Sequence, residues 1–286
     1  MKLTVTVITH NEAANIEAAL QSVAWADEII VVDSHSTDGT AEIARRYASR
    51  LEMRDWAGYG AQKNYAASLA SNDWILSLDA DERVTVALAE EIRRLLARGP
   101  DARGYRISRV TWYLGRWIRC TDWFPDFQLR LYDRRAGRWS ERSVHESFEL
   151  QERPRKLHGE LEHYAYRDIN HHVSKINQYT TMAAHDWVAR GRRTTGLELL
   201  LHPPLAFLRN YVLRAGFRAG AAGLVISALN SYYVFLKLAK LWEMQQASAA
   251  SPQPTVDHPS LAWRPQPPQP QAPRHGPRAP TRGSGG

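Results

Sequence analysis

The first hundred residues alternate short apolar runs with segments of helical periodicity. Three runs have the length and aliphatic content of buried strands: "KLTVTVIT" at 2–9, "DEIIVVD" at 27–33 and "DWILSLD" at 73–79. Apolar residues then recur every three or four positions in segments such as "NEAANIEAALQSV", "GAQKNYAASLA" and "TVALAEEIRRLLARGP". Strands and helices that alternate at this pitch predict an α/β fold with a mostly parallel, doubly wound, Rossmann-like sheet.

Polar residues stand at the carboxyl end of each predicted strand, at 9–12, 33–36 and 79–82. Ligands of open α/β sheets bind beyond these ends, so we expect the three clusters to line one crevice. The first cluster supplies Thr9, Asn11 and Glu12. Asp33 would accept a hydrogen bond from a base or ribose, and Lys63 would offer a cation, although a lone lysine on a helix is usually just solvated.

The stretch "WILSLDADERV" places Asp79, Asp81 and Glu82 directly after a buried strand. Such acids lose water and repel one another unless a cation lies among them. Asp79 and Asp81 can turn toward one face, where their oxygens suit a divalent cation that takes its other ligands from a diphosphate. Such a metal would stabilise a departing nucleoside diphosphate. The alternative is that these acids only cap the helix that starts near Thr85.

The pattern changes after residue 104. "GYRISRVTWYLG" and "FQLRLYDRRAGRWS" predict a small antiparallel extension of the sheet, and residues 170–190 predict a helix. The segment 247–286 holds ten of the fifteen prolines and too few apolar residues to offset the cost of ordering, so we expect it to be disordered.

Five segments, in this order and spacing, resemble a family 2 glycosyltransferase with a GT-A fold. They are "VITHNEAANIEAALQSV", "EIIVVDSHSTDGT", "YGAQKNYA", "DWILSLDADERV" and "WFPDFQLRLYDRR". Within that family the chain is most similar to the bacterial lipopolysaccharide core β-1,4-glucosyltransferase group. The resemblance implies a UDP-sugar donor, Mg²⁺ or Mn²⁺, and inversion at the anomeric carbon. It places Asp33 at the nucleoside, Asp79 at the ribose side and the metal, and Asp81 at the metal.

Inverting transfer also needs a base that takes the proton of the acceptor hydroxyl on the side away from the leaving diphosphate. Asp126 in "DWFPDFQLRLY" is the favoured candidate, beside Trp123 as a surface for sugar stacking. Glu146 in "SVHESF" is the alternative, either as base or as a residue that orients the acceptor. His145 could reach the metal, and Arg130 would suit the diphosphate.

Four parts follow from this interpretation. We expect a nucleotide-sugar-binding half at 1–103, a half for the acceptor and the catalytic base at 104–168, a helical region at 169–246, and the proline-rich tail at 247–286. The product would be a hexose, most simply glucose, joined to a glycolipid such as the inner core of lipopolysaccharide.

The net charge of +7 is concentrated toward the C-terminal end, where residues 186–246 carry eight Lys or Arg against three acids. Residues 219–236 form an uncharged segment of eighteen residues. This length is the lower limit for a helix that spans a membrane. The polar face of Ser227, Asn230 and Ser231, opposite a stripe of Val225, Leu229, Tyr232 and Leu236, favours a helix in the headgroup layer. A core helix and a true span are the alternatives.

Location and partners complete the prediction. The single cysteine, Cys120, excludes an intrachain disulfide, and the start lacks the pattern of a signal peptide. We therefore expect a peripheral protein on the cytoplasmic face of an anionic membrane. No aromatic-basic motif supports nucleic-acid binding. A membrane-bound nucleotide-sugar scaffold without turnover is the competing interpretation, and the intact acids at 79, 81 and 126 argue against it.

Overall fold

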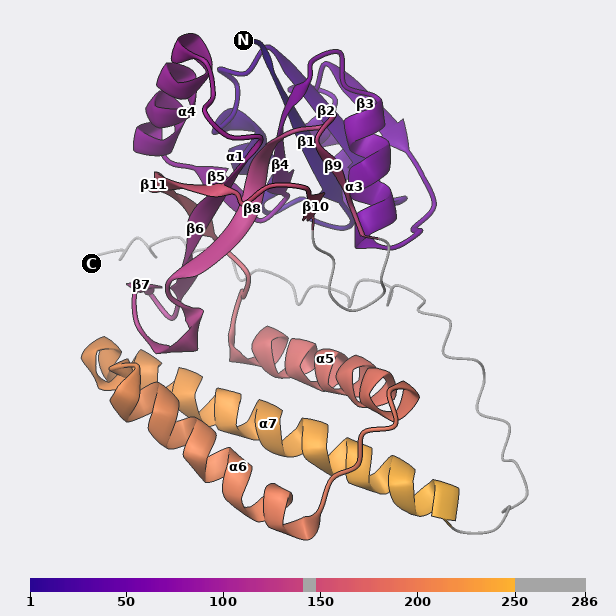
Figure 1. Cartoon of the computed structure of the whole chain (residues 1–286), viewed down its shortest axis with the longest axis vertical. Coiled ribbons are helices and arrows are strands. Elements are labelled where there is room, and N and C mark those ends of the chain that lie inside the picture. The colour runs from indigo at the N-terminus through magenta and orange to yellow at the C-terminus, as the bar shows by residue number, and fades with distance from the viewer. Residues whose placement is uncertain (141–147, 250–286) are drawn as a thin grey trace, which may run out of the picture. The chain divides into compact units, whose positions relative to one another are not determined.

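The computed structural model describes residues 1–140 and 148–249 (Figure 1). The strands are β1 (Leu3–Thr9), β2 (Glu28–Asp33), β3 (Arg50–Met53), β4 (Trp74–Asp79), β5 (Glu82–Val84), β6 (Gly104–Tyr113), β7 (Arg116–Ile118), β8 (Asp126–Asp133), β9 (Gly137–Trp139), β10 (Phe148–Leu150) and β11 (Arg155–His163). The helices are α1 (Ile16–Gln21), α2 (Thr40–Ala44), α3 (Tyr59–Ser68), α4 (Val86–Arg98), α5 (Ile169–Ala189), α6 (Gly196–Leu208) and α7 (Gly220–Ala249), with short helical turns η1 (Thr121–Trp123), η2 (Arg209–Leu213) and η3 (Gly216–Ala219).

Within the described residues, the main sheet has the strand order β3-β2-β1-β4-β8-β6-β11-β5, and β7 pairs with β6. Strands β3, β2, β1 and β4 are parallel, whereas β8 runs antiparallel to both β4 and β6. The predicted α/β fold with an antiparallel extension is confirmed. Because β4 pairs directly with β8, the segments 1–103 and 104–168 share one continuous sheet.

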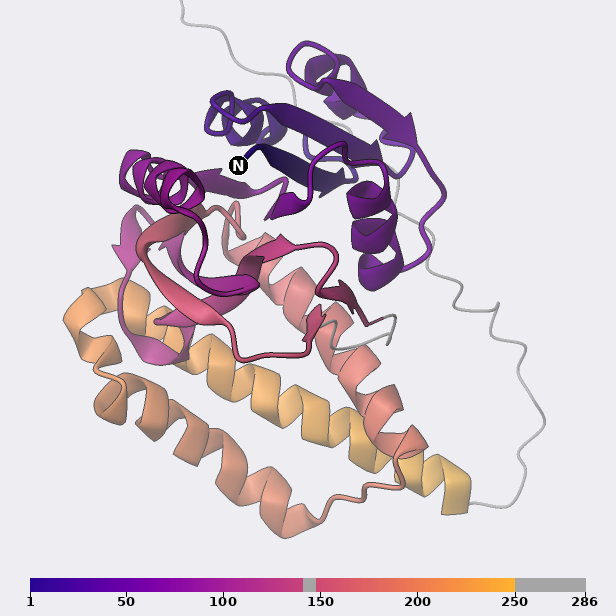
Figure 2. The ribbon, with the colours of Figure 1, turned by 45° about the horizontal axis from the view of Figure 1, so that its top comes forward.

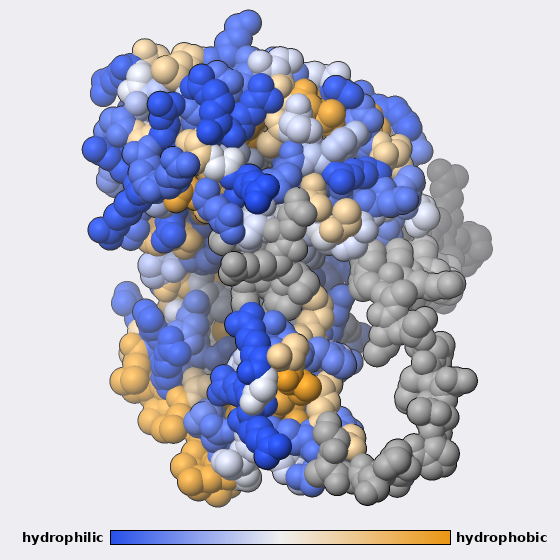
Figure 3. Space-filling view, turned by 45° about the vertical axis from the view of Figure 1, so that its right-hand side comes forward, coloured by the Kyte–Doolittle hydropathy of each residue, from blue (hydrophilic) through white to orange (hydrophobic). Residues whose placement is uncertain are grey.

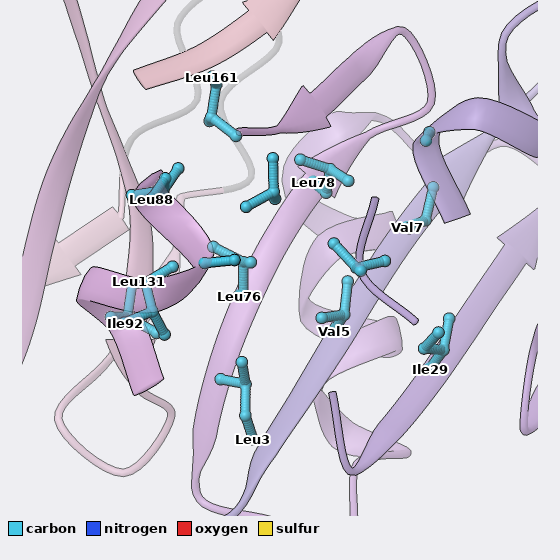
Figure 4. Close-up of a cluster of buried hydrophobic side chains, with 14 of the residues drawn as sticks. Leu3, Val5, Val7, Ile29, Leu76, Leu78, Leu88, Ile92, Leu131 and Leu161 are labelled. Carbon is cyan, nitrogen blue, oxygen red and sulfur yellow. The ribbon is translucent and has the colours of Figure 1, made fainter. Parts of the chain in front are cut away.

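The core lies between this sheet and the helices that cover it. All seven residues of β1 are buried, as expected for a central strand covered on both faces. Figure 4 shows aliphatic side chains of several elements that meet in one cluster, among them Leu76 of β4, Leu88 of α4 and Leu161 of β11. Each fully buried aliphatic side chain contributes about 1.5–3 kcal/mol, so this cluster fixes the strands whose ends carry the polar groups.

Helices α5, α6 and α7 form a separate layer, in which α7 packs against both α5 and α6 (Figures 1 and 2). A capping box at Thr195 and Glu198 begins α6. The segment Gly216–Ala247 is long and apolar enough to cross a membrane by length and composition, and little more than a quarter of its most apolar window is buried.

The predicted apolar stripe of α7 was wrong in its orientation. Of its four members only Tyr232 is exposed, while Val225 packs against the buried cluster around Tyr113 and Leu229 lines a cavity. The exposed large side chains of α7 are Leu224, Tyr232, Phe235 and Trp242. The helix therefore turns a different side outward than the sequence predicted. Helices α5 and α6 pack against its predicted polar side, where Ser227 is buried and the Ser231 hydroxyl donates to Pro203 O.

Candidate active site

The ends of β1 and β2 are tied together by hydrogen bonds. Ser34 N donates to Thr9 O at 2.9 Å, and Thr37 N donates to Asn11 Oδ1 at 2.8 Å. Asp33 Oδ1 accepts from Ser36 N at 2.7 Å, but its Oδ2 is buried and has no hydrogen-bond partner among the described residues. A buried acceptor without a partner is costly unless a ligand supplies a donor. Asp33 therefore suits the donor groups of a base or ribose.

Asp79 lies among cations that belong to the chain itself. Its Oδ1 is 3.3 Å from Lys63 Nζ, and its Oδ2 accepts from Arg130 Nη2. Burial alone would raise the pKa of Asp79, but the charges of Arg130, Lys63 and Arg109 outweigh burial and hold this pKa well below its usual range. Asp79 is thus a permanent carboxylate at the end of β4.

Further ion pairs extend this series across the sheet. Glu82 is fully buried, and its Oε1 accepts from Arg130 Nη2 at 2.6 Å and from Arg109 Nη1 at 3.1 Å. Arg109 also donates to Asp126 Oδ2, through Nη2 at 2.5 Å and through Nε at 2.8 Å. We call Lys63, Asp79, Arg130, Glu82, Arg109 and Asp126 the charge chain, because three cations and three acids alternate along it.

Each guanidinium of the charge chain stays charged. Burial would lower the pKa of Arg109, but Glu82 and Asp126 more than offset it, and the pKa is raised. Arg130 is 3% exposed, and its pKa is raised in the same way because Asp79 and Glu82 outweigh burial. Buried charges persist in proteins when they are paired and hydrogen-bonded, as they are here.

Asp81 differs from Asp79 because it is not held by a lysine or an arginine. Among the described residues, its carboxylate has one close partner, His163 Nε2 at 3.5 Å. Burial would raise the pKa of Asp81, but the hydrogen bond and charge of His163 outweigh burial and lower it. The ionised oxygens of Asp81 are ligands that Mg²⁺ or Mn²⁺ accepts, and the imidazole nitrogen of His163, in its neutral form, is a ligand for a transition metal such as Mn²⁺. These residues fit a divalent cation that takes its remaining ligands from water and a diphosphate.

The structure decides some of the alternatives about the acids at 79–82. Helix α4 is capped by Thr85, whose side chain accepts from Leu88 N at 3.3 Å, so the capping interpretation of the acids is wrong. Both oxygens of Asp79 are engaged by Lys63 and Arg130, which leaves Asp81 as the acid better placed for a metal. Arg130 points at Asp79 and Glu82, and its side chain is 4% exposed.

The candidate bases are placed differently. Asp126 begins β8 with its side chain 30% exposed, and Gln128 Nε2 donates to its Oδ1 at 2.6 Å. Trp123 stacks on Tyr166, with ring centroids 5.2 Å apart, so one of its faces is already covered by protein. Glu146 and His145 lie outside the described residues.

Sequence reasoning missed three residues of this site: Arg109, Gln128 and His163. One signal was present, because Asp126, Gln128 and Arg130 alternate along β8 and so project from one face of the strand. Arg109 and His163 gave no comparable signal. The pairing of β6 with β8 brings Arg109 to Asp126, and the pairing of β11 with β5 brings His163 opposite Glu82, beside Asp81.

Residues 4–154 match the profile of Glycosyl transferase family 2. The chain belongs to glycosyltransferase family 2. A lipopolysaccharide core biosynthesis glycosyltransferase of Rhizobium meliloti is 31% identical over 264 residues, which cover 90% of this chain and 97% of the relative. An uncharacterized glycosyltransferase of Rickettsia typhi is 31% identical over 86% of this chain and 89% of its own length.

Among solved structures, a mannosyltransferase from Pyrobaculum calidifontis in complex with GDP-Man and Mn²⁺ is 17% identical, with a TM-score of 0.44 over 88% of this chain and 76% of that chain. Family membership makes the protein a transferase of glycosyl groups. In this family 2 enzyme the polar clusters lie at the carboxyl ends of the parallel strands, which is where ligands bind in open α/β sheets.

Proposed function

We propose that this family 2 enzyme is a metal-dependent, inverting hexosyltransferase that moves a hexose, most simply glucose, from a UDP-sugar to a membrane glycolipid of the lipopolysaccharide core. The observation that carries the proposal is the contrast between two acids of the site. Asp81 has a carboxylate that pairs with no lysine or arginine in the described part of the chain and faces only His163, and Asp126 is aimed by Arg109 and Gln128 while it remains partly exposed. The first suits a metal, and the second suits a base.

The donor would lie against the ends of β1, β2 and β4. Thr9 Oγ1 and Asp33 Oδ2 are both buried without a hydrogen-bond partner among the described residues, and they would accept from the nucleoside. Asp81 and His163 would hold the divalent cation, which neutralises the charge that develops on the leaving diphosphate. Asp79 keeps Lys63 and Arg130 in place beside this position.

Asp126 would take the proton of the acceptor hydroxyl. A carboxylate has about four lone-pair positions. Arg109 Nε and Nη2 use those of Oδ2, and Gln128 uses one of Oδ1, so one position on Oδ1 remains for the proton. As the proton moves there, the acceptor oxygen bonds to the anomeric carbon and the bond from that carbon to the diphosphate oxygen breaks. Attack from the side opposite the leaving group inverts the configuration.

The acceptor class is supported by two observations. The Rhizobium meliloti relative is named for lipopolysaccharide core biosynthesis and is aligned over nearly its whole length. The helical layer also carries many exposed apolar side chains, and Figure 3 shows patches of hydrophobic surface on the lower part of the molecule. We call these exposed side chains the apolar outer face; its members are Leu197, Leu200, Leu201, Leu205, Leu208, Val212, Leu213, Phe217, Leu224, Tyr232, Phe235 and Trp242.

In this proposal α6 and α7 lie in the headgroup layer on the cytoplasmic side of the membrane, and α7 does not span the bilayer. Helix α5 packs along α7 and exposes Ser174, Asn177, Gln178 and His185 to its surroundings. A bilayer-crossing α7 would carry these polar side chains into hydrocarbon, where their hydrogen bonds to water would be lost. An interfacial α6–α7 pair avoids this cost.

The deciding experiment is a transfer assay with a panel of UDP-, GDP- and ADP-sugars and with O-deacylated inner-core lipopolysaccharide as acceptor. We expect product from one UDP-hexose in the presence of Mg²⁺ or Mn²⁺, with the opposite anomeric configuration to the donor by NMR. Donor binding without hydrolysis or transfer under any of these conditions would instead support the non-catalytic scaffold.

A further inference from the structure

A cavity of about 150 Å³ lies between the catalytic sheet and the helical layer. Trp123 of η1 and Tyr166, which precedes α5, form its wall toward the sheet. Helix α5 contributes Lys175, and α7 contributes Leu229, Asn230 and Tyr233. A water molecule takes about 30 Å³ in the liquid, so the volume corresponds to about five waters, which is on the order of one sugar ring.

The wall of the cavity toward the sheet is a fixed aromatic surface. Trp123 and Tyr166 stack at an interplanar angle of 24°, and the ring of His172 lies 4.2 Å from that of Tyr166. The hydroxyl of Tyr113 is 2.9 Å from His172 Nδ1 and ties this stack to β6. Rings held in this way offer apolar faces and polar edges without a cost of ordering, which suits the mixed C–H and hydroxyl surface of a sugar.

Two polar side chains, Asn230 and Lys175, line the cavity. The amide of Asn230 has no hydrogen-bond partner among the described residues, although α7 is otherwise largely apolar. Lys175 Nζ donates to Ala165 O at 3.0 Å, and in the described part of the chain no carboxylate forms a salt bridge with it. An amide and an ammonium that face the same small space are suited to hydroxyl and acidic groups of a ligand.

The cavity is close to the proposed catalytic groups. The charge of Lys175 acts on both Asp81 and Glu12: it adds to the effect of His163 that lowers the pKa of Asp81, and it only partly offsets burial, which raises the pKa of Glu12. Burial raises the pKa of Tyr166 to about 12, and Asp81 and Arg109 are among the charges that reach it. Trp123 stands three residues before Asp126. Lys175 and Trp123, which line the cavity, thus connect it to the proposed site: Lys175 through its charge on Asp81, and Trp123 through the short segment that leads to Asp126.

We propose that this cavity is an acceptor subsite that holds one acidic sugar ring of the glycolipid, with the ring against Trp123 and Tyr166. Asn230 hydrogen-bonds its hydroxyls, and Lys175 pairs with its carboxylate or phosphate group. This inference rests on the proposed function, because it takes the acceptor to be a glycan. It adds which residues outside the sheet select that acceptor: side chains of α5 and α7.

The test uses the full-length protein, the UDP-sugar found active, and O-deacylated inner-core lipopolysaccharide as the probe, so that membrane docking does not limit the assay. Lys175→Met and Asn230→Leu should raise the KM for the acceptor about tenfold or more, which is the usual effect of removing a charged or neutral hydrogen-bond partner from a ligand. Leu229→Trp, which fills the cavity, should raise it further. In Asn230→Leu and Leu229→Trp, the KM for the donor and the rate of donor hydrolysis should stay within about twofold of wild type.

Ser174→Trp is the matched control, because it adds the same ring to α5 at an exposed position beside Lys175. It should leave the KM for the acceptor unchanged. Saturation-transfer NMR on the bound probe gives a readout independent of turnover, and its signal should disappear in Leu229→Trp. Unchanged acceptor binding in Leu229→Trp, or a raised KM for the donor alone, overturns the inference. Absence of transfer by the wild type would instead overturn the proposed function.

Discussion

Arg109 joins Asp126 to the buried Glu82: its Nε and Nη2 hold one oxygen of Asp126, and its Nη1 donates to Glu82 Oε1 at 3.1 Å. Glu82 is fixed in turn by Arg130, which contacts Asp79. The acid at the donor side of the site and the acid proposed as base are therefore linked through four ion pairs. The positive charge that the acids at 79–82 require is thus supplied in part by side chains of the protein, namely Lys63, Arg109 and Arg130.

Asp126→Asn tests the assignment of the base. The side chain keeps its size, so binding of the donor should be preserved while glycosyl transfer falls about 10²-fold or more, the usual effect of losing a general base. Isothermal titration with the donor and initial rates of transfer measure the two quantities. Glu90→Gln, a change at an exposed acid of α4, is the control and should be silent. The assignment is wrong if Glu146→Gln shows the large loss of transfer rate and Asp126→Asn transfers at a nearly normal rate.

Asp81→Ala tests the metal site. Because no lysine or arginine of residues 1–140 and 148–249 pairs with Asp81, its removal should abolish turnover that depends on Mg²⁺ or Mn²⁺ and leave the fold intact by circular dichroism. Excess EDTA should give the same loss in the wild type, and added metal should restore it. Full activity of the wild type in EDTA would exclude the metal from the mechanism.

Asp79→Asn should lower the stability of the free protein. The change leaves Lys63 and Arg130 buried with less compensation, and such a loss costs up to about 3–5 kcal/mol when a pair is fully buried. The side chain of Asp79 is 29% exposed, so we expect a smaller cost, about 1–2 kcal/mol, and a melting temperature lower by about 2–8 °C. Asp81→Asn is the comparison and should change the melting temperature less. A higher melting temperature of Asp79→Asn would mean that repulsion among the acids outweighs their ion pairs.

The fold of the N-terminal half could be predicted because three of its strands, β1, β2 and β4, are runs of aliphatic and β-branched residues. Strand β4, for example, is bounded by Asp73 and by the polar residues after Leu78, so its length and its end are visible in the sequence. Strand β5 could not be predicted, since three residues, Glu82–Val84, carry no periodicity of their own and are placed by pairing with β11.

The structure brings part of the predicted site residues together for the same physical reason. Strand ends of a parallel sheet meet at one edge, which brings Thr9, Asp33 and Asp79 together without knowledge of any contact. Partners across antiparallel strands depend on register, and no local pattern fixes the register of β6 against β8 that places Arg109 opposite Asp126. The orientation of α7 was missed because α5 and α6, rather than the helix's own polarity, decide which side is covered.

The stability of the protein should fall as the pH falls from about 6.5 to about 4 through His172. Burial first, and then the charges of His171 and Lys175, lower the pKa of His172 from 6.5 to about 4. Between these values the unfolded chain binds a proton that the folded protein does not, so the free energy of unfolding drops by at most about 1.4 kcal/mol per pH unit. Below about pH 4 this contribution is gone.

Urea unfolding at about pH 7 and about pH 5 measures the effect. His172→Gln keeps a group that can hydrogen-bond to Tyr113 but does not titrate, so the difference in unfolding free energy between the two pH values should be smaller than in the wild type. Other titrating groups cancel in this comparison. An equal difference in both proteins would show that His172 does not contribute.

Docking of the helical layer on a membrane should depend more on the apolar outer face than on basic charge. Lys240 donates to Asn177, Thr180 and Thr181 of α5, and Lys237 lies over Trp187 at 4.4 Å, so neither is directed at lipid. Arg209 and Arg214 pair with Asp122, and Arg218 is exposed. Each free basic residue near an anionic surface contributes about 1 kcal/mol, whereas a leucine that becomes fully buried contributes about 1.5–3 kcal/mol.

Vesicle flotation therefore should recover the protein with anionic liposomes and, to a smaller extent, with neutral ones, and high salt should remove only the difference between them. Alkaline carbonate should release an interfacial helix at least partly, whereas it would not release a span. The double variant Leu200→Glu with Leu213→Glu should lose flotation, because both side chains lie on the apolar outer face and are 69% and 77% exposed. Val86→Glu is the matched control, since Val86 is 78% exposed on α4 and should be silent. Truncation after Gln246 should also leave flotation unchanged, and failure of the wild type to float with either lipid would exclude docking through this face.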